Sequence, residues 1–269
     1  MKTHDEIADY YNRSHNYYQK IWGNNISIGL HNRANLSLQE ASNNTLELMI
    51  ALLQNIDKAN ILDLGSGYGE TARYLARKGA HITCLNISQV QNDFNIQYNK
   101  TENLEDKIVV VTGSFENIPS EDKIFDVVIS RDSLMYSQDR ERVFLEVKRV
   151  LKAGGDFVFT DFLISENIPD TANLDFINDD PYVQSLASFL SYNNLAKKVG
   201  FQVKNTIDLS YHFANHYRKI NRIFEQKREE LEVDIPREEI LFFVANNVKR
   251  RIAPCEKGYL QWGVLHFSQ

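Results

Sequence analysis

The chain has 269 residues, of which 43% are hydrophobic and 25% are charged, and its formal net charge is −6. This balance excludes disordered and fibrous classes, and the negative charge argues against a nucleic-acid-binding surface, which needs clustered Lys and Arg. The polar, acidic start with no apolar run behind it argues against a secretory signal and a membrane span, so we expect a cytoplasmic protein built as one α/β domain with insertions.

The first 35 residues are unusually aromatic. Tyr10, Tyr11, Tyr17, Tyr18 and Trp22 fall within thirteen residues. Such a segment is either a helix that docks its aromatic face on the core or a lid over a ligand, because aromatic faces attract sulfonium and methylated ammonium groups. We assign residues 1–35 to an N-terminal lid or cap.

A helix is predicted next, because Ser37 and Glu40 form a capping box and apolar residues from Leu46 onward recur at helical spacing. Strand and helix patterns then alternate, which predicts a doubly wound, mostly parallel α/β sheet, a Rossmann-like fold. The expected strands are 61–64, 82–85, 108–111, 125–129 and 156–160, and the expected helices between them are 71–78, 89–100 and 140–151. Gly154 and Gly155 are expected to stop the last of these helices. Residues 36–163 are assigned to a cofactor-binding core.

The pattern changes beyond residue 163. Residues 164–184 are rich in Asp, Asn and Pro and predict an irregular insertion, whereas 192–199 has a helical pattern that stops at Gly200. Residues 211–251 are mainly helical in pattern, and 259–267 predicts a closing strand. We expect 164–269 to complete the same domain, with the basic run 249–251 as the solvated end of a helix, where cations suit the helix dipole.

The most informative motif is residues 61–69, ILDLGSGYG, where a strand breaks into a glycine turn and then a helix. Its G-x-G-x-G spacing and the position of Asp63 differ from the G-x-G-x-x-G of dinucleotide folds. The motif resembles the first motif of class I S-adenosylmethionine-dependent methyltransferases. That resemblance implies that Gly65, Ser66, Gly67 and Gly69 lie against the methionine half of the cofactor, with Asp63 at its amino group.

Ligands of open α/β sheets bind beyond the carboxyl ends of the strands, which nominates further residues. Asn86 follows the second strand in place of the carboxylate that commonly binds a ribose, which disfavours tight NAD binding. After the third strand come Gly113, Ser114 and Phe115, which suit an adenine pocket, although Phe115 fits the core equally well. After the fourth strand, Leu134 is expected beneath the cofactor and Arg131 to Tyr136 near the reacting atoms.

Blocks over nearly the whole chain resemble the sarcosine/dimethylglycine N-methyltransferases that make glycine betaine. They are 21–23, 28–30, 62–69, 84–92, 113–115, 216–217 and 260–263. The replacement of the usual acidic residue by Asn86, with Ile87 and Gln91 after it, is the most telling. The resemblance implies a cytosolic monomer or weak homodimer that moves a methyl group from S-adenosylmethionine to the nitrogen of sarcosine or dimethylglycine.

The aromatic segment and the needs of an amino acid acceptor extend the expected site. Besides the residues already given, Tyr18 and Trp22 are expected at the cofactor, together with Arg131. The expected acceptor residues are Tyr17, Arg33, Arg131, Tyr136, His216, Tyr217 and Trp262. Where related enzymes often have a histidine after the fourth strand, this chain has Tyr136, which leaves the acceptor contact open.

Methyl transfer to an amine requires alignment of nitrogen, methyl carbon and sulfur, and a free lone pair on the nitrogen. Asp132, Tyr136 or His216 could take the amine proton through water, and Arg131 or Arg33 could bind an acceptor carboxylate unless they form surface ion pairs. No metal-ligand spacing is present.

Three alternative functions stay open. The first is methylation of another small molecule, such as phosphoethanolamine, a sterol or tocopherol-like ring, or a specialised metabolite, since the fold alone does not select the acceptor. The second is cofactor binding without turnover. The third is a nicotinamide oxidoreductase, which the glycine spacing disfavours.

Overall fold

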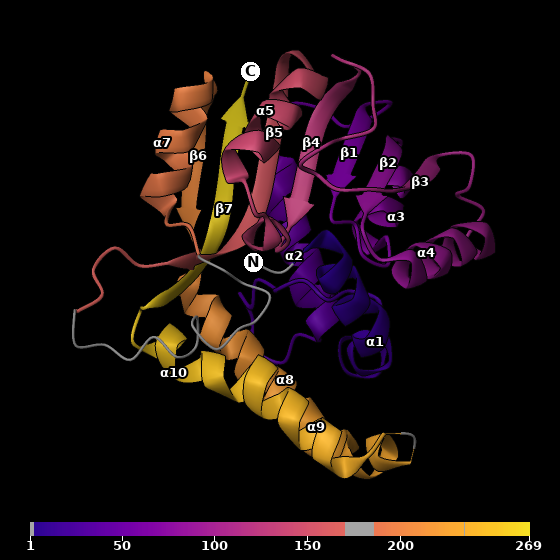
Figure 1. The fold of residues 1–269 in the computed structure, drawn as a ribbon, viewed down its shortest axis with the longest axis vertical. Helices are drawn as coiled ribbons and strands as arrows, with labels where there is room; N and C mark the ends of the chain where they lie inside the picture. The colour runs from indigo at the N-terminus through magenta and orange to yellow at the C-terminus, as the bar shows by residue number, and fades with distance from the viewer. Residues whose placement is uncertain (1–2, 170–185, 234) are drawn as a thin grey trace.

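The computed structural model describes residues 3–169, 186–233 and 235–269, so most of the predicted insertion at 164–184 lies outside the described residues (Figure 1). These residues form a seven-stranded sheet in the order β3-β2-β1-β4-β5-β7-β6. The strands are β1 (Asn60–Leu64), β2 (His81–Asn86), β3 (Ile108–Thr112), β4 (Phe125–Arg131), β5 (Leu151–Ile164), β6 (Gln202–Asp208) and β7 (Leu260–Ser268). Strands β1 to β5 run parallel, and β7 lies antiparallel between β5 and β6. The predicted doubly wound, mostly parallel fold is confirmed.

The helices that precede or separate the strands up to β6 follow the predicted pattern closely. They are α2 (Leu38–Ala51), α3 (Glu70–Arg77), α4 (Gln89–Thr101), α5 (Arg140–Val150) and α7 (Phe189–Val199). The predicted capping box is present, because the Ser37 side chain accepts a hydrogen bond from the Glu40 N–H and the Glu40 side chain accepts one in return. Helix α7 ends at Gly200 as expected.

Two elements differ from the prediction. Helix α5 ends at Val150 and not at the glycines, because Leu151 is already extended, fully buried and paired with Phe125 of β4. Gly154 therefore lies within β5 and does not stop the helix. Strand β6 was not predicted, since it pairs only with β7 at the sheet edge and its side chains are mostly exposed, without the apolar alternation that marks a strand.

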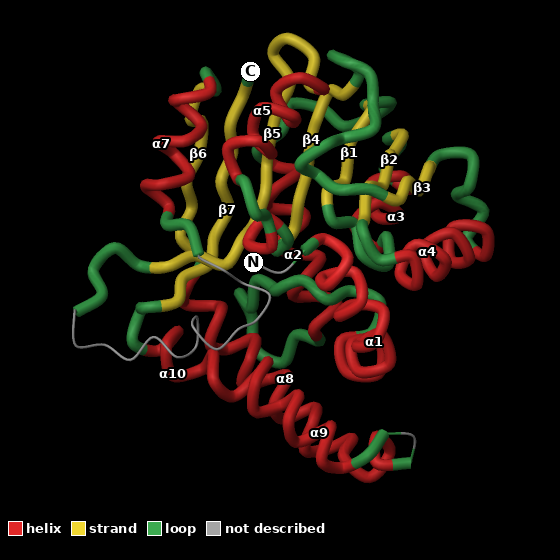
Figure 2. The backbone as a smooth tube through the Cα atoms, in the orientation of Figure 1, coloured by secondary structure: helices red, strands yellow, loops and turns green. Residues whose placement is uncertain are grey.

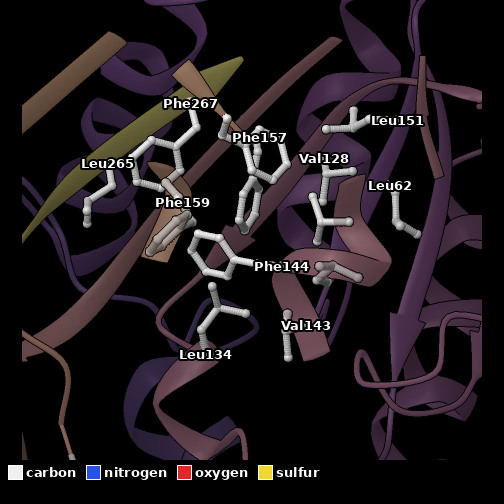
Figure 3. Packing of buried hydrophobic residues seen from close by; sticks show 14 of the residues in the cluster. Leu62, Val128, Leu134, Val143, Phe144, Leu151, Phe157, Phe159, Leu265 and Phe267 are labelled. Carbon is white, nitrogen blue, oxygen red and sulfur yellow. The ribbon is translucent and has the colours of Figure 1, made fainter. Parts of the chain in front are cut away.

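A cluster of phenylalanines fixes α5 on one face of the sheet (Figure 3). The Phe144 ring lies 5.4 Å from that of Phe157, 6.2 Å from Phe159 and 5.9 Å from Phe267, measured between centroids, and all four side chains are fully buried. Burying one such ring stabilises the fold by roughly 1.5–3 kcal/mol. The opposite face packs against α2 and α3 through residues such as Leu46, so helices cover both faces of the sheet.

The remaining helices lie together beyond the carboxyl ends of the parallel strands (Figures 1 and 2). They are α1 (His4–Trp22), α8 (Ser210–Glu232), α9 (Arg237–Val244), the π-helical turn η2 (Ala245–Lys249) and α10 (Arg250–Glu256). Trp22 of α1 packs in one cluster with Phe213 and Tyr217 of α8 and with Trp262 of β7. Residues far apart in the sequence thus together cover the end of the sheet at which ligands of this fold class bind. Within the described ranges, no helix is both long and apolar enough to cross a bilayer.

Candidate functional site

A pocket of about 1260 Å³, part of it open to solvent, lies between the strand ends and helix α1. One end is formed by the glycine turn and by residues after β2 and β3, and the other by aromatic side chains from α1, η1 (Leu134–Tyr136), β5 and α8.

The glycine turn forms the floor of the first end. Gly65, Ser66 and Gly67 line the pocket, whereas Gly69 lies behind them as the N-cap of α3. Gly69 has a φ of 78°, and a Cβ there would come within 1.9 Å of the Asn95 Oδ1 atom. Only glycine satisfies both the backbone angle and the close approach of Asn95, which fixes the path of the turn into α3.

Asp63 is the acidic group of this end. It lies on β1 between Cys84 of β2 and Ile129 of β4 and is 2% exposed. Among the described residues its Oδ2 atom has no hydrogen-bond partner, and burial raises the pKa of the carboxyl to about 7, against the opposing pull of the Arg131 charge. A buried acceptor oxygen that faces a pocket fits a ligand with a cationic amino group.

The residues after β2 and β3 line the same end. They are Asn86, Ile87, Gln91, Gly113, Ser114 and Phe115. The Asn86 Nδ2 donates to the Gln91 Oε1 at 3.0 Å. The amide oxygen and nitrogen of Asn86 are the groups that can contact a ribose diol here. The start of α1 lies over this end, since the His4 Nε2 is 3.3 Å from the Ser114 Oγ and 3.3 Å from a Glu116 carboxylate oxygen.

Asp132, after β4, connects three parts of the chain. It has a φ of 55°, and its Oδ2 accepts the Ile28 N–H at 2.7 Å while its Oδ1 accepts the Trp262 indole N–H at 2.8 Å. Burial raises the pKa of Asp132, and Arg131 opposes that shift. Asp132 lines the pocket, but Trp262 is fully buried behind it. Both carboxylate oxygens are thus engaged in holding the 28–30 segment and β7 beside the pocket.

Arg131 also lines the pocket, and its guanidinium is turned toward α2. It donates to the Ser42 Oγ at 2.6 Å, to the Ser42 carbonyl at 3.3 Å and to the Ile28 carbonyl at 3.4 Å. Desolvation lowers the pKa of Arg131, while the charges of Asp132 and Asp63 raise it. These contacts connect β4, α2 and the segment at Ile28, which favours a role for Arg131 in holding the pocket wall.

His216 is not brought to the pocket. It is fully buried in α8, where its Nδ1 accepts the Gly29 N–H at 3.2 Å and lies 3.1 Å from the His31 Nε2. Burial, with the His31, Arg131 and Lys219 charges, lowers the pKa of His216 well below its usual value. His216 therefore contacts the segment before α2 and is not itself a lining residue of the pocket, although its ring lies edge-on to that of Tyr217, which is one.

Two other predicted site residues do not line the pocket, and the side chain of a third lies outside the described part of the structure. Arg33 is exposed, Leu134 is buried in the phenylalanine cluster, and the adjacent Met135 lines the pocket instead. Nothing is described for the Tyr17 side chain.

The second end is an aromatic chamber formed by Tyr11, Tyr18, Trp22, Tyr136, Phe162 and Tyr217. The Tyr11 ring centroid lies 5.8 Å from that of Tyr18 and 5.7 Å from that of Tyr136, and the Tyr18 ring lies 5.4 Å from Trp22. Burial raises the pKa values of Tyr11 and Tyr18 well above the ordinary range, so both phenols stay neutral. The chamber offers ring faces and neutral hydroxyls, which suits a small organic cation.

Tyr11 was absent from the predicted site although a signal existed. Tyr11, Tyr18 and Trp22 are spaced at i, i+7 and i+11, which places them on one face of α1. If helical spacing had been applied to the aromatic residues of 10–22, these three would have been predicted together as site residues.

Helix α1 is docked over the pocket by polar contacts as well as by rings. The Tyr68 hydroxyl is 2.7 Å from the His15 Nδ1, and His15 stacks on Phe94 at 4.3 Å. Farther along, the Ser88 Oγ donates to the Asn12 Oδ1 at 2.7 Å. These contacts connect α1 to the glycine turn and to α4, so the helix forms a wall of the pocket in this structure.

Arg251 of α10 also lines the chamber, contrary to the expected solvated helix end. It is 9% exposed, its guanidinium carbon lies 5.5 Å from the Phe162 ring centroid and 5.7 Å from that of Tyr217, and its Nη1 donates to the Tyr217 hydroxyl at 3.3 Å. Of the basic run, only Lys249 is exposed, and its ammonium lies 3.7 Å from a Glu225 carboxylate oxygen. The prediction was wrong for Arg251.

Comparison with known proteins gives relatives that match nearly the whole chain. A family model described as "Methyltransferase domain" matches residues 62–159. Sarcosine/dimethylglycine N-methyltransferase from Aphanothece halophytica is 35% identical, over 98% of this chain and 96% of that protein. Glycine/sarcosine/dimethylglycine N-methyltransferase from Actinopolyspora halophila is 38% identical over 96% of this chain, which spans 46% of that protein's length. A crystal structure of a candidate sarcosine dimethylglycine methyltransferase from Galdieria sulphuraria has a TM-score of 0.87 and 31% identity, covering 95% of this chain and 98% of that one.

Proposed function

We propose that this chain, which belongs to the sarcosine/dimethylglycine N-methyltransferase family, transfers methyl groups to the amino nitrogen of sarcosine and dimethylglycine and so produces glycine betaine. The chain is an S-adenosylmethionine-dependent methyltransferase, which confirms the enzyme class and the cofactor predicted from the glycine turn. Its substrate is a small molecule.

The observation that carries the choice of acceptor is the aromatic chamber opening into the same pocket as the glycine turn. Ring faces stabilise a methylated ammonium by cation–π contact, and sarcosine, dimethylglycine and glycine betaine carry one, two and three N-methyl groups. A sterol or tocopherol-like acceptor would require a long apolar surface, whereas this chamber contains tyrosine hydroxyls and a guanidinium. A small zwitterion fits it better.

The first end of the pocket fits S-adenosylmethionine group by group. The main chain of the glycine turn and the unpartnered Asp63 oxygen suit the methionine portion with its amino group. Asn86 suits the ribose, and Ser114 and Phe115 suit the adenine edge and face. When bound, S-adenosylmethionine supplies a sulfonium methyl group, which bonds to the acceptor nitrogen lone pair as the carbon–sulfur bond breaks.

The residues of the chain act mainly by alignment. A displacement of this kind needs the acceptor nitrogen in line with the methyl carbon and sulfur, and the chamber walls restrict the acceptor to one approach. The amine proton must leave before transfer. We propose that this proton passes to water on the Tyr136 side of the chamber, because Asp132 is already engaged by two donors and His216 does not line the pocket.

We further propose that residues 1–35 act as a lid on a core of 36–163, and that 164–269 complete the same domain. We also propose a cytoplasmic monomer or weak homodimer without nucleic-acid partners; the net charge of −6 supports only the last of these. Limited proteolysis with and without S-adenosylhomocysteine tests the lid, because cleavage within α1 should slow when the pocket is filled. Sedimentation velocity tests the oligomeric state.

The acceptor is tested by calorimetric titration with S-adenosylhomocysteine, followed by mass-spectrometric assay of turnover with glycine, sarcosine, dimethylglycine and phosphoethanolamine. Methylation of sarcosine or dimethylglycine supports the proposal. Turnover of phosphoethanolamine alone, or binding without turnover on any acceptor, overturns the proposed acceptor and favours another small molecule or a protein that binds the cofactor without turnover.

A matched pair of variants tests the chamber itself. Tyr11→Leu keeps an apolar side chain and removes a ring face, so we expect the KM for dimethylglycine to rise by about 2- to 30-fold, the equivalent of one lost cation–π contact. Tyr211→Leu, at a position 79% exposed, should change nothing. Equal KM values for the two variants would contradict the chamber as the acceptor site.

A further inference from the structure

The acceptor end of the pocket contains a buried guanidinium, that of Arg251, which was predicted from the sequence to lie in solvent. Arg251 lies over the rings of Phe162 and Tyr217 and donates to the Tyr217 hydroxyl. Its charge also reaches the other walls, since it lowers the pKa values of Tyr11 and Tyr18 against the larger effect of burial. Ring faces stabilise such a cation, but a planar guanidinium binds a carboxylate more strongly, because it can donate two parallel hydrogen bonds to it.

The local backbone explains why Arg251 faces inward. Residues Ala245–Lys249 form a π-helical turn directly before α10. A π turn takes one residue more than an α turn, and each residue of an α-helix advances by about 100°, so the side chains after it are rotated by that amount. Lys249 remains exposed, whereas Arg251 reaches the pocket. Turns of this kind are frequent at functional sites, because they re-aim a side chain at some cost in regular hydrogen bonding.

The second cation of the pocket is placed differently. Three hydrogen bonds of Arg131 go to Ser42 and to the Ile28 carbonyl, on the side of α2. Arg251 instead lies among the aromatic rings, where the acceptor is proposed to bind. Tyr217 accepts from Arg251, and within the described residues its hydroxyl proton has no acceptor, so it can donate to a ligand.

We propose that Arg251, assisted by the Tyr217 hydroxyl, binds the carboxylate of the acceptor and makes the enzyme selective for amino acids over amino alcohols and simple amines. This inference rests on the proposed N-methylation of a small amino acid. In such an acceptor a single carbon separates the carboxylate from the nitrogen, so an anchored carboxylate confines the nitrogen to the space between Arg251 and the glycine turn.

The experiment compares the wild-type protein with Arg251→Gln, Arg251→Lys and, as the matched control, Lys249→Gln, which removes one exposed charge from the same helical segment. Each is assayed with dimethylglycine and with N,N-dimethylethanolamine, which has the same dimethylamino group but no carboxylate. Calorimetry measures the affinity for S-adenosylhomocysteine, and then the affinity of the S-adenosylhomocysteine-loaded protein for glycine betaine, a readout independent of turnover.

We expect Arg251→Gln to raise the KM for dimethylglycine by about 100-fold and to weaken glycine betaine binding equally, in the range found when one partner of a buried charge pair is removed. Arg251→Lys should lose about tenfold, because an ammonium keeps the charge but not the planar fork. The KM for N,N-dimethylethanolamine and the affinity for S-adenosylhomocysteine should stay within about twofold, which a merely structural role would not produce.

Unchanged kinetics for dimethylglycine in a folded Arg251→Gln protein would overturn the inference, as would an equal loss with both acceptors. If Arg251→Gln does not fold, Arg251→Lys and Tyr217→Phe test the inference in its place. For each variant, the KM for dimethylglycine is compared with the KM for N,N-dimethylethanolamine, and only the former should rise. The proposed function fails separately, through a wild-type protein that methylates no amino acid acceptor.

Discussion

Replacement of Asp63 by Asn should make the ligand-free protein more stable. The Asp63 carboxyl is buried on β1, and burial, partly offset by Arg131, raises its pKa from 3.8 to about 7. In free energy, the difference between those two pKa values corresponds to about 4 kcal/mol. Asn has nearly the same shape and no charge to desolvate, so Asp63→Asn should recover up to this amount above pH 7.

The sign of the effect follows from proton binding. Below about pH 4 the carboxyl is protonated in both the folded and the unfolded chain, so it costs nothing. Between pH 4 and 7 the unfolded chain ionises first, and the free energy of unfolding of the wild-type protein falls. Above pH 7 the carboxyl is ionised in both states, and the full free-energy cost of burying its charge lowers the stability of the folded protein. The stability difference between Asp63→Asn and the wild type should therefore be near zero at pH 4 and largest at pH 8.

Urea unfolding followed by circular dichroism at pH 4, 6 and 8 measures this difference. Asp161 is also buried with a pKa raised to about 7, chiefly by desolvation, so only the difference between the two proteins isolates Asp63. Asp126→Asn is the control of opposite sign, because hydrogen bonds from Lys152 and Asn60 outweigh desolvation and hold the pKa of Asp126 below its usual value. That variant should be less stable than the wild type at pH 8.

The same substitution should harm function. A neutral amide cannot pair with the amino group of the cofactor, and loss of one partner of a buried charge pair costs roughly 2–5 kcal/mol, so the Kd for S-adenosylhomocysteine should rise by about 30-fold or more. An Asp63→Asn protein no more stable than the wild type at pH 8, or one that binds S-adenosylhomocysteine normally, would refute the reasoning.

Three further substitutions have defined outcomes. Gly69→Ala should lower the free energy of unfolding by at least about 2 kcal/mol and weaken S-adenosylhomocysteine binding, because φ is 78° and the new Cβ would lie 1.9 Å from the Asn95 Oδ1; urea unfolding and calorimetry measure both. Trp262→Phe should cost about 1.5–3 kcal/mol in urea unfolding, because Asp132 loses the indole donor at 2.8 Å. His216→Gln should flatten the loss of stability between pH 6.5 and 4, since His216 stays neutral in the folded protein while the unfolded chain binds a proton; Tm recorded across that range gives the slope.

Each of these has an internal check. Gly258 also has a positive φ of 71° but nothing within 4 Å of a new Cβ, so Gly258→Ala should cost less than Gly69→Ala. A Trp262→Phe protein as stable as the wild type would show that the Asp132 contact contributes nothing. If Tm falls as steeply between pH 6.5 and 4 in His216→Gln as in the wild type, protonation of His216 is not the cause of that fall.

The parts of the fold that were predictable are those determined by short-range patterns. The strand–glycine–helix run at 61–69 and the capping box at Ser37 contain their own start and stop signals, so their bounds were close to correct. Strand β6 was not predictable in this way, because its pairing with β7 joins segments about sixty residues apart and its burial is slight.

In the candidate site too, some residues were predictable from local sequence patterns and others were not. Residues that follow a strand, such as Asn86 and Ser114, could be nominated because all parallel strands end at one edge of the sheet. Residues supplied by helices depend on helix phase and docking. Arg251 faces the pocket only because a π turn precedes it, and His216 faces away because α8 buries that side against Gly29. No local pattern in the sequence encodes either rotation.

The position of β7 also bears on how the chain folds during synthesis. β7 is made after every other strand, yet it lies between β5 and β6 and hydrogen-bonds to both along its length. Until residues 260–268 leave the ribosome, β6 has no neighbour to pair with, and the β5 edge is unprotected. The five-stranded parallel part can form earlier, but the pocket wall at Asp132 waits for Trp262. Cofactor binding by a nascent chain should therefore appear only after the final strand has emerged.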